Sequence, residues 1–310
     1  MRVRCTRRTF LGAAGVLLVA GCTSTKTTVE ANTATVTHAF GETTVPAPPQ
    51  RVASLGFTEQ DSLLALGVVP IATTEWFGGE PFAVWPWARA ALGAAQPRVL
   101  SLANGIQVGE IAAMQPDLIV ATNAGVDADT YAALSAIAPT IPQSGRDAFF
   151  EPWKTQAVSI ATAVFQREAM EALIQGVDEQ VVAAGTAHPQ FKDKTVALLA
   201  GTAWNGAITV TAPGWRTDFL TQMGFVVADL DPLPLDQLRP ALADIDVLIW
   251  ATESEAEQAA LLAHPDIAGF GRRNVFTTKE LAGAIAFSSP LSLPVVADQL
   301  PPLLVGALGG

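Results

Sequence analysis

Residues 165–187, FQREAMEALIQGVDEQVVAAGTA, have the pattern of one long amphipathic helix. Apolar residues recur at the three-to-four spacing of one helix face: Phe165, Ala169, Leu173, Val177, Val181 and Ala184. A helix of this length spans about 30 Å at ~1.5 Å per residue. We expect it to be a rigid connection between two similar α/β lobes with a ligand cleft between them. An ordinary surface helix within one domain has the same pattern, so the flanking sequence must decide.

On both sides of this helix, short apolar runs alternate with short helical patterns. Strands are expected at 52–55, 68–74, 98–100, 118–122 and 140–141, and then at 195–200, 208–211, 247–251 and 275–277. Helices are expected at 62–66, 88–92, 108–114 and 131–138, and then at 215–223, 236–242, 255–263 and 292–304. Such alternation predicts the α/β class, with a doubly wound parallel sheet in each lobe.

A weak internal repeat supports two related lobes. In the first copy, Glu110 starts a short helix that leads into PDLIVAT (116–122). In the second copy, Asp236 starts a helix that leads into DVLIWAT (246–252). The predicted organisation is therefore a first lobe at 50–150, a linking helical region at 151–188 and a second lobe at 189–310.

The N-terminus has the features of an export leader over residues 1–21. Arg7 and Arg8 precede an uncharged apolar run too short to span a bilayer, and the run ends at VAGC, residues 19–22. The arginine pair resembles a twin-arginine signal, and VAGC resembles a bacterial lipobox, in which Cys22 is lipidated. A plain signal peptide with an incidental cysteine is the alternative. Residues 22–49, rich in Thr, Ala and Pro, are expected to form the lipidated N-terminus and a flexible tether, with an edge strand possible at 34–38.

Composition limits the partners. Half of the 310 residues are apolar and 15% are charged, so the chain can bury a sizeable core. Its net charge is −11, and four of its 18 basic residues lie in the leader, so a nucleic-acid partner is not expected. Cys5 and Cys22 are the only cysteines, so the mature chain has no disulfide or thiolate metal site.

Several motifs in order resemble one known family over nearly all of the mature chain. These are the lipobox, RVASLGFTEQDSLLALGVVPIATT (51–74), GEIAAMQPDLIVAT (109–122) and the central helix. They are similar to the cluster A (class III) solute-binding lipoproteins of bacterial ABC importers for ferric siderophores, haem and cobalamin. The resemblance implies two α/β lobes bridged by a rigid helix, one ligand between them and an extracytoplasmic, lipid-anchored monomer. It also implies docking on the permease through one acid per lobe, here Glu110 and Asp236. Asp236 departs from the family's usual Glu, and both acids could be simple helix-start residues.

In doubly wound sheets, ligands bind beyond the carboxyl ends of the strands. This rule selects ligand-contact candidates in the loops: Phe57, Trp76, Phe77, Asn104, Asn123, Arg146, Trp204, Asn205, Trp215, Arg216 and Lys279. Aromatic faces with a few cations suit a large, flat, anionic chelate, and Arg146 and Arg216 are the preferred cationic contacts. Core packing is expected instead for Trp87, Trp153 and Trp250.

The residue types rank the possible ligands. His38, His188 and His264 lack metal-ligand spacing, and Tyr131 is the only tyrosine that could ligate haem. A ferric siderophore supplies its own iron ligands, so no protein cofactor or metal site is expected; haem ranks second and cobalamin third. An enzyme is disfavoured, because the chain has no Gly-rich phosphate loop, G-x-S-x-G motif or Cys/His cluster. A surface lipoprotein that acts only through protein contacts is the other alternative.

Overall fold

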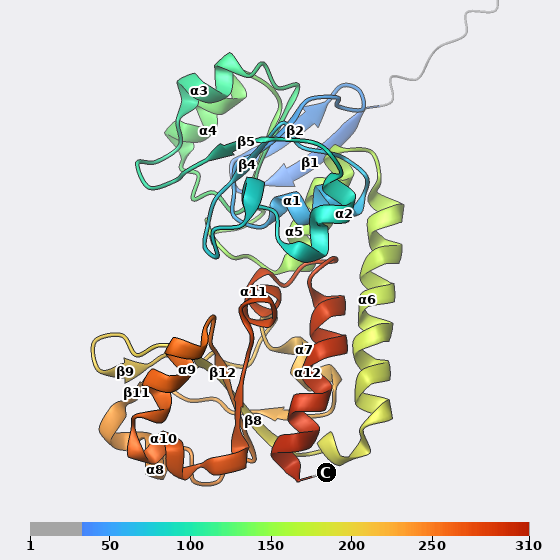
Figure 1. Ribbon diagram of the computed structural model, residues 1–310. Coiled ribbons are helices and arrows are strands. Elements are labelled where there is room, and N and C mark those ends of the chain that lie inside the picture. The colour runs from blue at the N-terminus through green and yellow to red at the C-terminus, as the bar shows by residue number, and fades with distance from the viewer. Residues whose placement is uncertain (1–32, 310) are drawn as a thin grey trace, which may run out of the picture. The chain divides into compact units, whose positions relative to one another are not determined.

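The first lobe is built on a five-stranded sheet in which every neighbouring pair is parallel (Figure 1). The computed structural model describes residues 33–309, so the leader and Cys22 lie outside the described residues. The strand order is β5 (Arg98–Leu100), β4 (Ala72–Thr74), β3 (Val52–Ser54), β6 (Leu118–Ala121) and β7 (Thr140–Pro142). All residues of β3, β4, β6 and β7 are buried, as expected for a sheet covered on both faces.

The second lobe contains a four-stranded parallel sheet and a small antiparallel pair. The sheet order is β10 (Val226–Val227), β8 (Thr195–Ala200), β12 (Val247–Ala251) and β13 (Asn274–Phe276). The antiparallel pair joins β9 (Ala207–Ile208) to β11 (Leu233–Pro234). Residues 209–211, expected in a strand, lie outside β9. The two main sheets share one order, because β4-β3-β6-β7 corresponds to β10-β8-β12-β13.

In each lobe, one aspartate at the start of a central strand (β6 or β12) forms hydrogen bonds with the start of the neighbouring strand (β3 or β8). The Asp117 carboxylate, before β6, accepts from the backbone N–H groups of Gln50 (2.8 Å) and Arg51 (2.7 Å), before β3. Asp246, before β12, accepts from the N–H of Thr195 at 2.8 Å, at the start of β8. Each aspartate directly precedes its strand, although the two lie one position apart in the internal repeat, and each holds the neighbouring central strand through the backbone.

Helices cover both sheets. In the first lobe they are α1 (Glu59–Ala65), α2 (Arg89–Leu92), α3 (Val108–Ala113) and α4 (Ala128–Ser135), with 3-10 turns at Pro81–Ala83 and Pro86–Ala88. In the second they are α7 (Asp218–Gln222), α8 (Leu238–Ala241), α9 (Glu255–Leu262), α10 (Pro265–Gly269), α11 (Lys279–Phe287) and α12 (Leu293–Leu308), with 3-10 turns at Pro189–Phe191, Leu235–Gln237 and Gly271–Arg273.

The connection between the lobes is α5 (Trp153–Ala163) followed by α6 (Arg167–Ala187). The long helix begins two residues later than expected, because Phe165 has a left-handed φ of 61° in the turn after α5. The face assigned to its first half is also wrong: Ala169 and Leu173 are exposed, and Met170 is buried instead. Farther along, Val177 and Val181 are buried as expected, and α6 packs against α12 (Figure 1).

Part of the expected tether is folded. Strands β1 (Ala34–His38) and β2 (Gly41–Val45) form an antiparallel hairpin. Val36 and Val45 are buried with residues of the first-lobe core, so this segment gains apolar burial that a tether lacks. The edge strand expected at 34–38 is present, and the tether prediction is wrong from residue 34 to residue 45.

Other differences lie at element ends. Residues 68–71 are not in β4, and residues 215–217 precede α7. Helix α4 begins at Ala128, three residues earlier than expected, because the Asp127 carboxylate caps it by accepting from the N–H of Thr130 at 2.8 Å.

Trp153 and Trp250 are buried as expected, whereas Trp87 is only half-buried. Among residues 33–309 no helix is both long and apolar enough to cross a membrane.

Candidate functional site

Aromatic side chains gather where the first-lobe strands end. Phe57 follows β3 and stacks on Trp76, which follows β4, with ring centroids 5.5 Å apart. Phe149 and Phe150, beyond β7, stack on Phe57 at 5.7 and 6.2 Å. Phe77 meets Trp76 edge-on at 4.5 Å. The carboxyl ends of three parallel strands therefore present one continuous aromatic surface, which we call the aromatic cluster.

The second lobe reaches this cluster through Phe287, the last residue of α11. Its ring lies 5.6 Å from Trp76, 5.8 Å from Trp85 and 5.6 Å from Trp87. Phe287 is buried by these contacts. The lobes are therefore held together at the cleft by aromatic packing.

A buried carboxylate holds the loops that carry this cluster. Glu59, at the first position of α1, accepts hydrogen bonds from the N–H of Asn123 (2.8 Å), the N–H of Gly56 and the hydroxyls of Ser54 and Thr122. Burial raises the pKa of Glu59 to about 7, and the hydrogen bonds oppose that rise. Glu59 therefore fixes the chain after β3 to the chain after β6.

Asn123 has a positioning role in this structure. Its side chain is buried, donates to the Thr58 hydroxyl at 3.1 Å and accepts from the N–H of Phe150 at 2.8 Å. The amide therefore orients Phe150, and it does not face the cleft as a free contact.

Arg216 is the cation that the second lobe adds to the aromatic cluster. Its guanidinium carbon lies 4.6 Å from the centre of the Phe150 ring and 5.0 Å from that of Trp215. The side chain is half-buried, and none of the ion pairs formed by residues 33–309 involves it. Burial lowers the pKa of Arg216 from its usual value, but a guanidinium stays charged at neutral pH. An unpaired cation between aromatic faces is suited to bind an anion with a flat π system.

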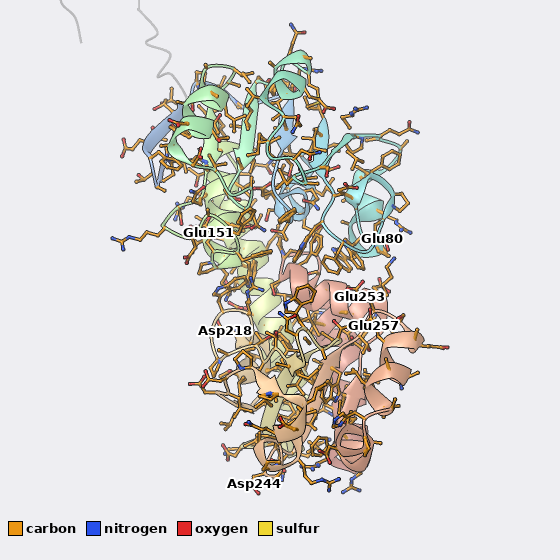
Figure 2. All side chains as sticks on the ribbon, turned by 90° about the vertical axis from the view of Figure 1, so that its left-hand side faces the viewer. Glu80, Glu151, Asp218, Asp244, Glu253 and Glu257 are labelled. Carbon is orange, nitrogen blue, oxygen red and sulfur yellow. The ribbon has the colours of Figure 1, made fainter. Side chains whose placement is uncertain are left out.

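Lys279 is engaged across the lobe junction. Its ammonium lies 2.7 Å from a carboxylate oxygen of Glu80, whose side chain is 10% exposed, and 5.6 Å above the Trp85 ring. Glu80 also pairs with Arg89. Figure 2 shows Glu80 on the first lobe facing Glu253 on the second, and Lys279 acts electrostatically on that second acid as well. The ammonium therefore pairs with an acid of the other lobe, Glu80, while its charge opposes the rise that burial causes in the pKa of Glu253.

Two small cavities lie beside the aromatic cluster. One, of about 200 Å³, is lined by Trp76, Phe77, Trp85 and Phe287 together with Glu75 and Glu80. The other, of about 150 Å³, is lined by Arg216 and by second-lobe residues such as Thr211 and Ile285. Each is smaller than the roughly 300–1,000 Å³ of typical ligand pockets.

Four predicted contacts lie apart from the aromatic cluster. Asn104 and Arg146 are exposed on the first lobe. Trp204 is 77% exposed in the turn that precedes β9, and Asn205 beside it has a left-handed φ of 49°. Among residues 33–309 no hydrogen bond or ring contact joins these four side chains to the cluster.

Sequence reasoning missed Phe149, Phe150 and Phe287. The adjacent pair Phe149-Phe150 was a usable signal, because it directly follows the loop after β7 and precedes Pro152. Phe287 gave no such signal, because it ends an apolar helix in which Leu281, Ala284 and Ile285 are buried in the second-lobe core.

The fold and site can now be compared with known proteins. A family profile described as periplasmic binding protein matches residues 52–270. The chain belongs to this family of periplasmic binding proteins. A periplasmic solute binding protein of Mycobacterium smegmatis shares 61% identity with it, at a TM-score of 0.88 over 89% of this chain and 99% of that one. The family and its structural relatives are solute-binding proteins and not enzymes.

More distant relatives agree with this periplasmic binding fold. The probable siderophore-binding lipoprotein YfiY of Bacillus subtilis is 25% identical over 224 residues, which are 70% of this chain and 66% of the relative. The iron-uptake protein PiaA of Streptococcus pneumoniae, solved with ferrichrome, is 21% identical and matches with a TM-score of 0.70 over 88% of this chain and 98% of that one. At that identity the match shows the two-lobe fold alone.

Proposed function

We propose that this binding protein captures a ferric siderophore between its lobes and delivers it to an ABC permease. The observation that carries the proposal is Arg216, a half-buried cation without a carboxylate partner among residues 33–309, set against Phe150 and Trp215. A ferric chelate with an anionic, conjugated periphery offers both the charge and the flat surface that this arrangement favours. The relatives named for siderophores support the same ligand class.

The protein supplies no iron ligands in this proposal. Among residues 33–309 no group of three or more His, Cys, Asp and Glu side chains could hold a metal ion. Tyr131, the only tyrosine, has its hydroxyl within 3.0 Å of the Thr43 hydroxyl and 3.3 Å of a His38 ring nitrogen. These contacts favour a ligand that carries its own coordination sphere over haem ligated by tyrosine.

Binding requires the lobes to separate at the cleft. Phe287 packs against the first-lobe aromatic residues, and the cavities of about 200 and 150 Å³ beside them are smaller than typical ligand pockets. We infer that Phe287 withdraws from Trp76 when the ligand enters and that the aromatic faces then contact the ligand. Lys279, released from Glu80, becomes a second cationic contact.

Docking is assigned to Glu110 and Asp236. Glu110 lies in the first turn of α3, is partly exposed and pairs with Arg98 at 2.7 Å. Asp236 lies in the 3-10 turn Leu235–Gln237 before α8, at the equivalent place in the second lobe. The proposal is that arginines of the permease meet both acids and displace Arg98 from Glu110.

Anchoring is assigned to Cys22, with export through a twin-arginine leader and function at the outer face of the cell membrane. The lipobox pattern and the lipoprotein relatives support this assignment. Replacement Cys22→Ser tests it, because loss of palmitate incorporation is expected, whereas continued incorporation would exclude Cys22 as the anchor.

Tryptophan fluorescence tests the ligand. Trp76, Trp85 and Trp87 surround Phe287, so a ferric siderophore in the cleft should quench emission at submicromolar concentration. The titration uses ferric hydroxamate, catecholate and carboxylate siderophores, with haem and cobalamin as comparisons. Trp76→Ala should weaken binding of the best ligand. A flat response to the whole panel would refute the proposal.

A further inference from the structure

Helix α11 of the second lobe packs against Trp85 of the first lobe. Lys279, Gly283 and Phe287 lie four residues apart and therefore share one face of this helix. The Lys279 ammonium lies 5.6 Å from the centre of the Trp85 ring, and the Phe287 ring lies 5.8 Å from it in an edge-to-face arrangement. Trp85 is 2% exposed. One face of α11 is thus in contact with a single indole ring across the lobe junction.

Gly283 and Gly78 both approach the Trp85 ring closely. A Cβ atom added at Gly283 would lie 2.5 Å from two ring carbons, and one added at Gly78, in the first lobe, would lie 2.5 Å from a third. Carbon atoms in contact are normally about 3.5–4.0 Å apart. Because the ring already touches the backbone of its own lobe at Gly78, it has little room to move away from a side chain at position 283. The closed contact therefore requires glycine at that position.

The helix itself gains nothing from this glycine. Gly283 is the fifth of the nine residues of α11, and glycine inside a helix is less favourable than alanine. The three atoms nearest to a Cβ added there all belong to Trp85. The contact with the other lobe is therefore what favours glycine at position 283.

The same face of α11 covers the aromatic cluster. The Phe287 ring lies 5.6 Å from Trp76 and 6.2 Å from Phe77. The cavity beside these rings has a volume of about 200 Å³, which is smaller than a typical ligand pocket. A ligand that stacks on Trp76 must displace Phe287, the last residue of α11. The contact of Gly283 with Trp85 keeps α11 in the place where Phe287 blocks that ligand.

We propose that the contact between Trp85 and Gly283 is autoinhibitory: it holds α11 over the aromatic cluster, and a ligand binds only when the contact opens. The identity of the ligand rests on the proposed function, whereas the contact does not. The apparent affinity of such a protein is the affinity of its open form multiplied by the fraction that is open. A substitution that weakens the contact therefore raises the affinity, whereas loss of a contact that supports the site would lower it.

Gly283→Ala in the full mature protein tests the proposal, with Gly176→Ala as the matched control. Both replace a glycine inside a helix by alanine, but a Cβ added at Gly176, in α6, meets nothing within 4 Å. The probe is anilinonaphthalene sulfonate, a flat aromatic anion that binds exposed apolar surface and gains fluorescence there. Its affinity should rise at least about threefold in Gly283→Ala and stay unchanged in Gly176→Ala. Equal affinity in the two variants would overturn the proposal.

Ser289→Ala weakens the same junction without adding an atom. The Ser289 hydroxyl, two residues beyond Phe287, donates a hydrogen bond to the carboxylate of Asp61 in the first lobe. Affinity for the dye should rise about twofold when this bond is lost. A fall in dye affinity in both Gly283→Ala and Ser289→Ala would show that the junction supports the site instead of blocking it, and it would also overturn the proposal.

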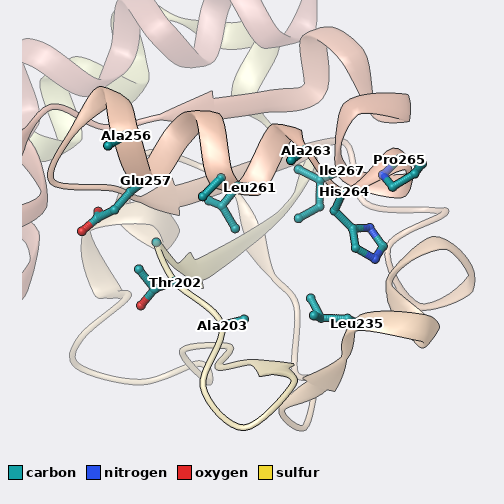
Figure 3. A pocket seen from close by; sticks show the side chains of 12 residues that line it. Thr202, Ala203, Leu235, Ala256, Glu257, Leu261, Ala263, His264, Pro265 and Ile267 are labelled. Carbon is teal, nitrogen blue, oxygen red and sulfur yellow. The ribbon is translucent and has the colours of Figure 1, made fainter.

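Two further variants locate the bound dye. A pocket of about 530 Å³ beside α9 offers the dye a second apolar surface (Figure 3). Ala260→Phe fills that pocket from an exposed position, so the gain in Gly283→Ala should persist when the two are combined. Arg216→Met should instead remove most of the gain, because Arg216 is the cation beside the aromatic cluster. A gain that is lost with Ala260→Phe and kept with Arg216→Met would place the dye in the other pocket and overturn the proposal.

The ferric siderophores of the fluorescence titration are measured on the same variants. A siderophore that binds at the aromatic cluster should gain affinity in Gly283→Ala, as the dye does. If the dye gains affinity and no siderophore binds any variant, the proposed function fails while the autoinhibitory contact is confirmed. The two failures are therefore distinguished.

Discussion

The carboxylate of Asp61 and the hydroxyl of Ser289 lie 2.6 Å apart, although 228 residues separate them in the chain. Asp61 belongs to α1 of the first lobe, and Ser289 follows α11 of the second. The same carboxylate oxygen accepts from the indole N–H of Trp87 at 2.8 Å, and the other oxygen, Oδ1, is buried and has no hydrogen-bond partner within residues 33–309. This bond lies next to Phe287, so polar and aromatic contacts close the lobes at one place.

This buried acid predicts a pH-dependent stability. Burial raises the pKa of Asp61 from 3.8 to about 6, and the hydrogen bonds from Ser289 and Trp87 oppose the rise. The folded state therefore holds the proton more tightly than the unfolded chain. The resulting stabilisation is complete below about pH 4 and is lost as pH rises through 6. A shift of this size corresponds to on the order of 2–3 kcal/mol.

Asp61→Asn removes this titration while keeping an oxygen acceptor for Ser289. Urea unfolding between pH 4 and pH 7 should show a smaller loss of stability with rising pH than in the unmodified protein. Some pH dependence remains, because Glu59, with its pKa raised by burial to about 7, acts in the same direction. Asp244→Asn, at an exposed position, is the control. Parallel pH profiles for the protein and Asp61→Asn would contradict the assignment.

Phe287→Ala is predicted to loosen the lobe junction. The ring contacts Trp76, Trp85 and Trp87, and its removal from a buried position should cost about 3 kcal/mol in unfolding free energy. Tryptophan emission should shift to longer wavelength, and small-angle scattering should show a larger radius of gyration. Phe276→Ala removes a ring that stacks on Trp250 within the second lobe, so it should leave the radius unchanged. An unchanged radius in Phe287→Ala would argue against its role in closing the lobes.

Arg216→Met is predicted to weaken binding of an anionic ferric siderophore at least tenfold. The charge-assisted hydrogen bonds that it would lose contribute about 1.5–3 kcal/mol. Arg146→Met is the matched comparison, because the sequence favoured both arginines equally and only Arg216 lies against the aromatic cluster. Calorimetry with the ligand found by fluorescence gives both affinities. A larger loss in Arg146→Met than in Arg216→Met would reverse the choice of cationic contact.

The paired replacement Glu110→Arg and Asp236→Arg is predicted to abolish uptake without changing ligand affinity. Both acids lie in first turns away from the aromatic cluster, and reversing their charge should repel arginines of a permease. Transport of labelled ferric siderophore into cells is the measurement. Glu171→Arg with Glu179→Arg, at exposed positions of α6, controls for the change in net charge. Normal uptake by the Glu110 and Asp236 variant would refute the docking assignment.

The elements predicted best from the sequence are strands that are buried on both faces. Strands Thr195–Ala200 and Val247–Ala251 have the expected bounds, because burial on both faces produces unbroken apolar runs. The long helix was recognised, but half of its buried face was not, because Ala169 and Leu173 fit the spacing as well as Met170 does. Periodicity cannot distinguish apolar positions that meet a partner from those that do not.

The candidate site was predicted only where chain topology determines it. Phe57 and Trp76 meet because parallel strands end at one edge of the sheet. The partner of Lys279, in contrast, is Glu80, 199 residues away on the other lobe. Such a contact depends on how the lobes close, which local sequence does not encode. Asn123 illustrates a related difficulty, because a loop amide can face a ligand or orient Phe150, and its residue type fits both roles.

The internal repeat leads to a final prediction about stability. Asp117 and Asp246 make similar contacts: the Asp117 carboxylate accepts from the backbone N–H groups of Gln50 and Arg51, and the Asp246 carboxylate accepts from the backbone N–H and the hydroxyl of Thr195. Asp117→Ala and Asp246→Ala should each lower the unfolding free energy by about 1–2 kcal/mol, because the N–H groups lose a charged acceptor. The aspartates lie in different lobes, so the double variant should lose the sum of the two effects within about 0.5 kcal/mol. Urea unfolding measures all three variants, with Asp231→Ala in an exposed loop as the control. Strong non-additivity would show that the two sheets do not respond independently. Losses of unfolding free energy no larger than that of Asp231→Ala would show that the two aspartates do not stabilise the strands they contact.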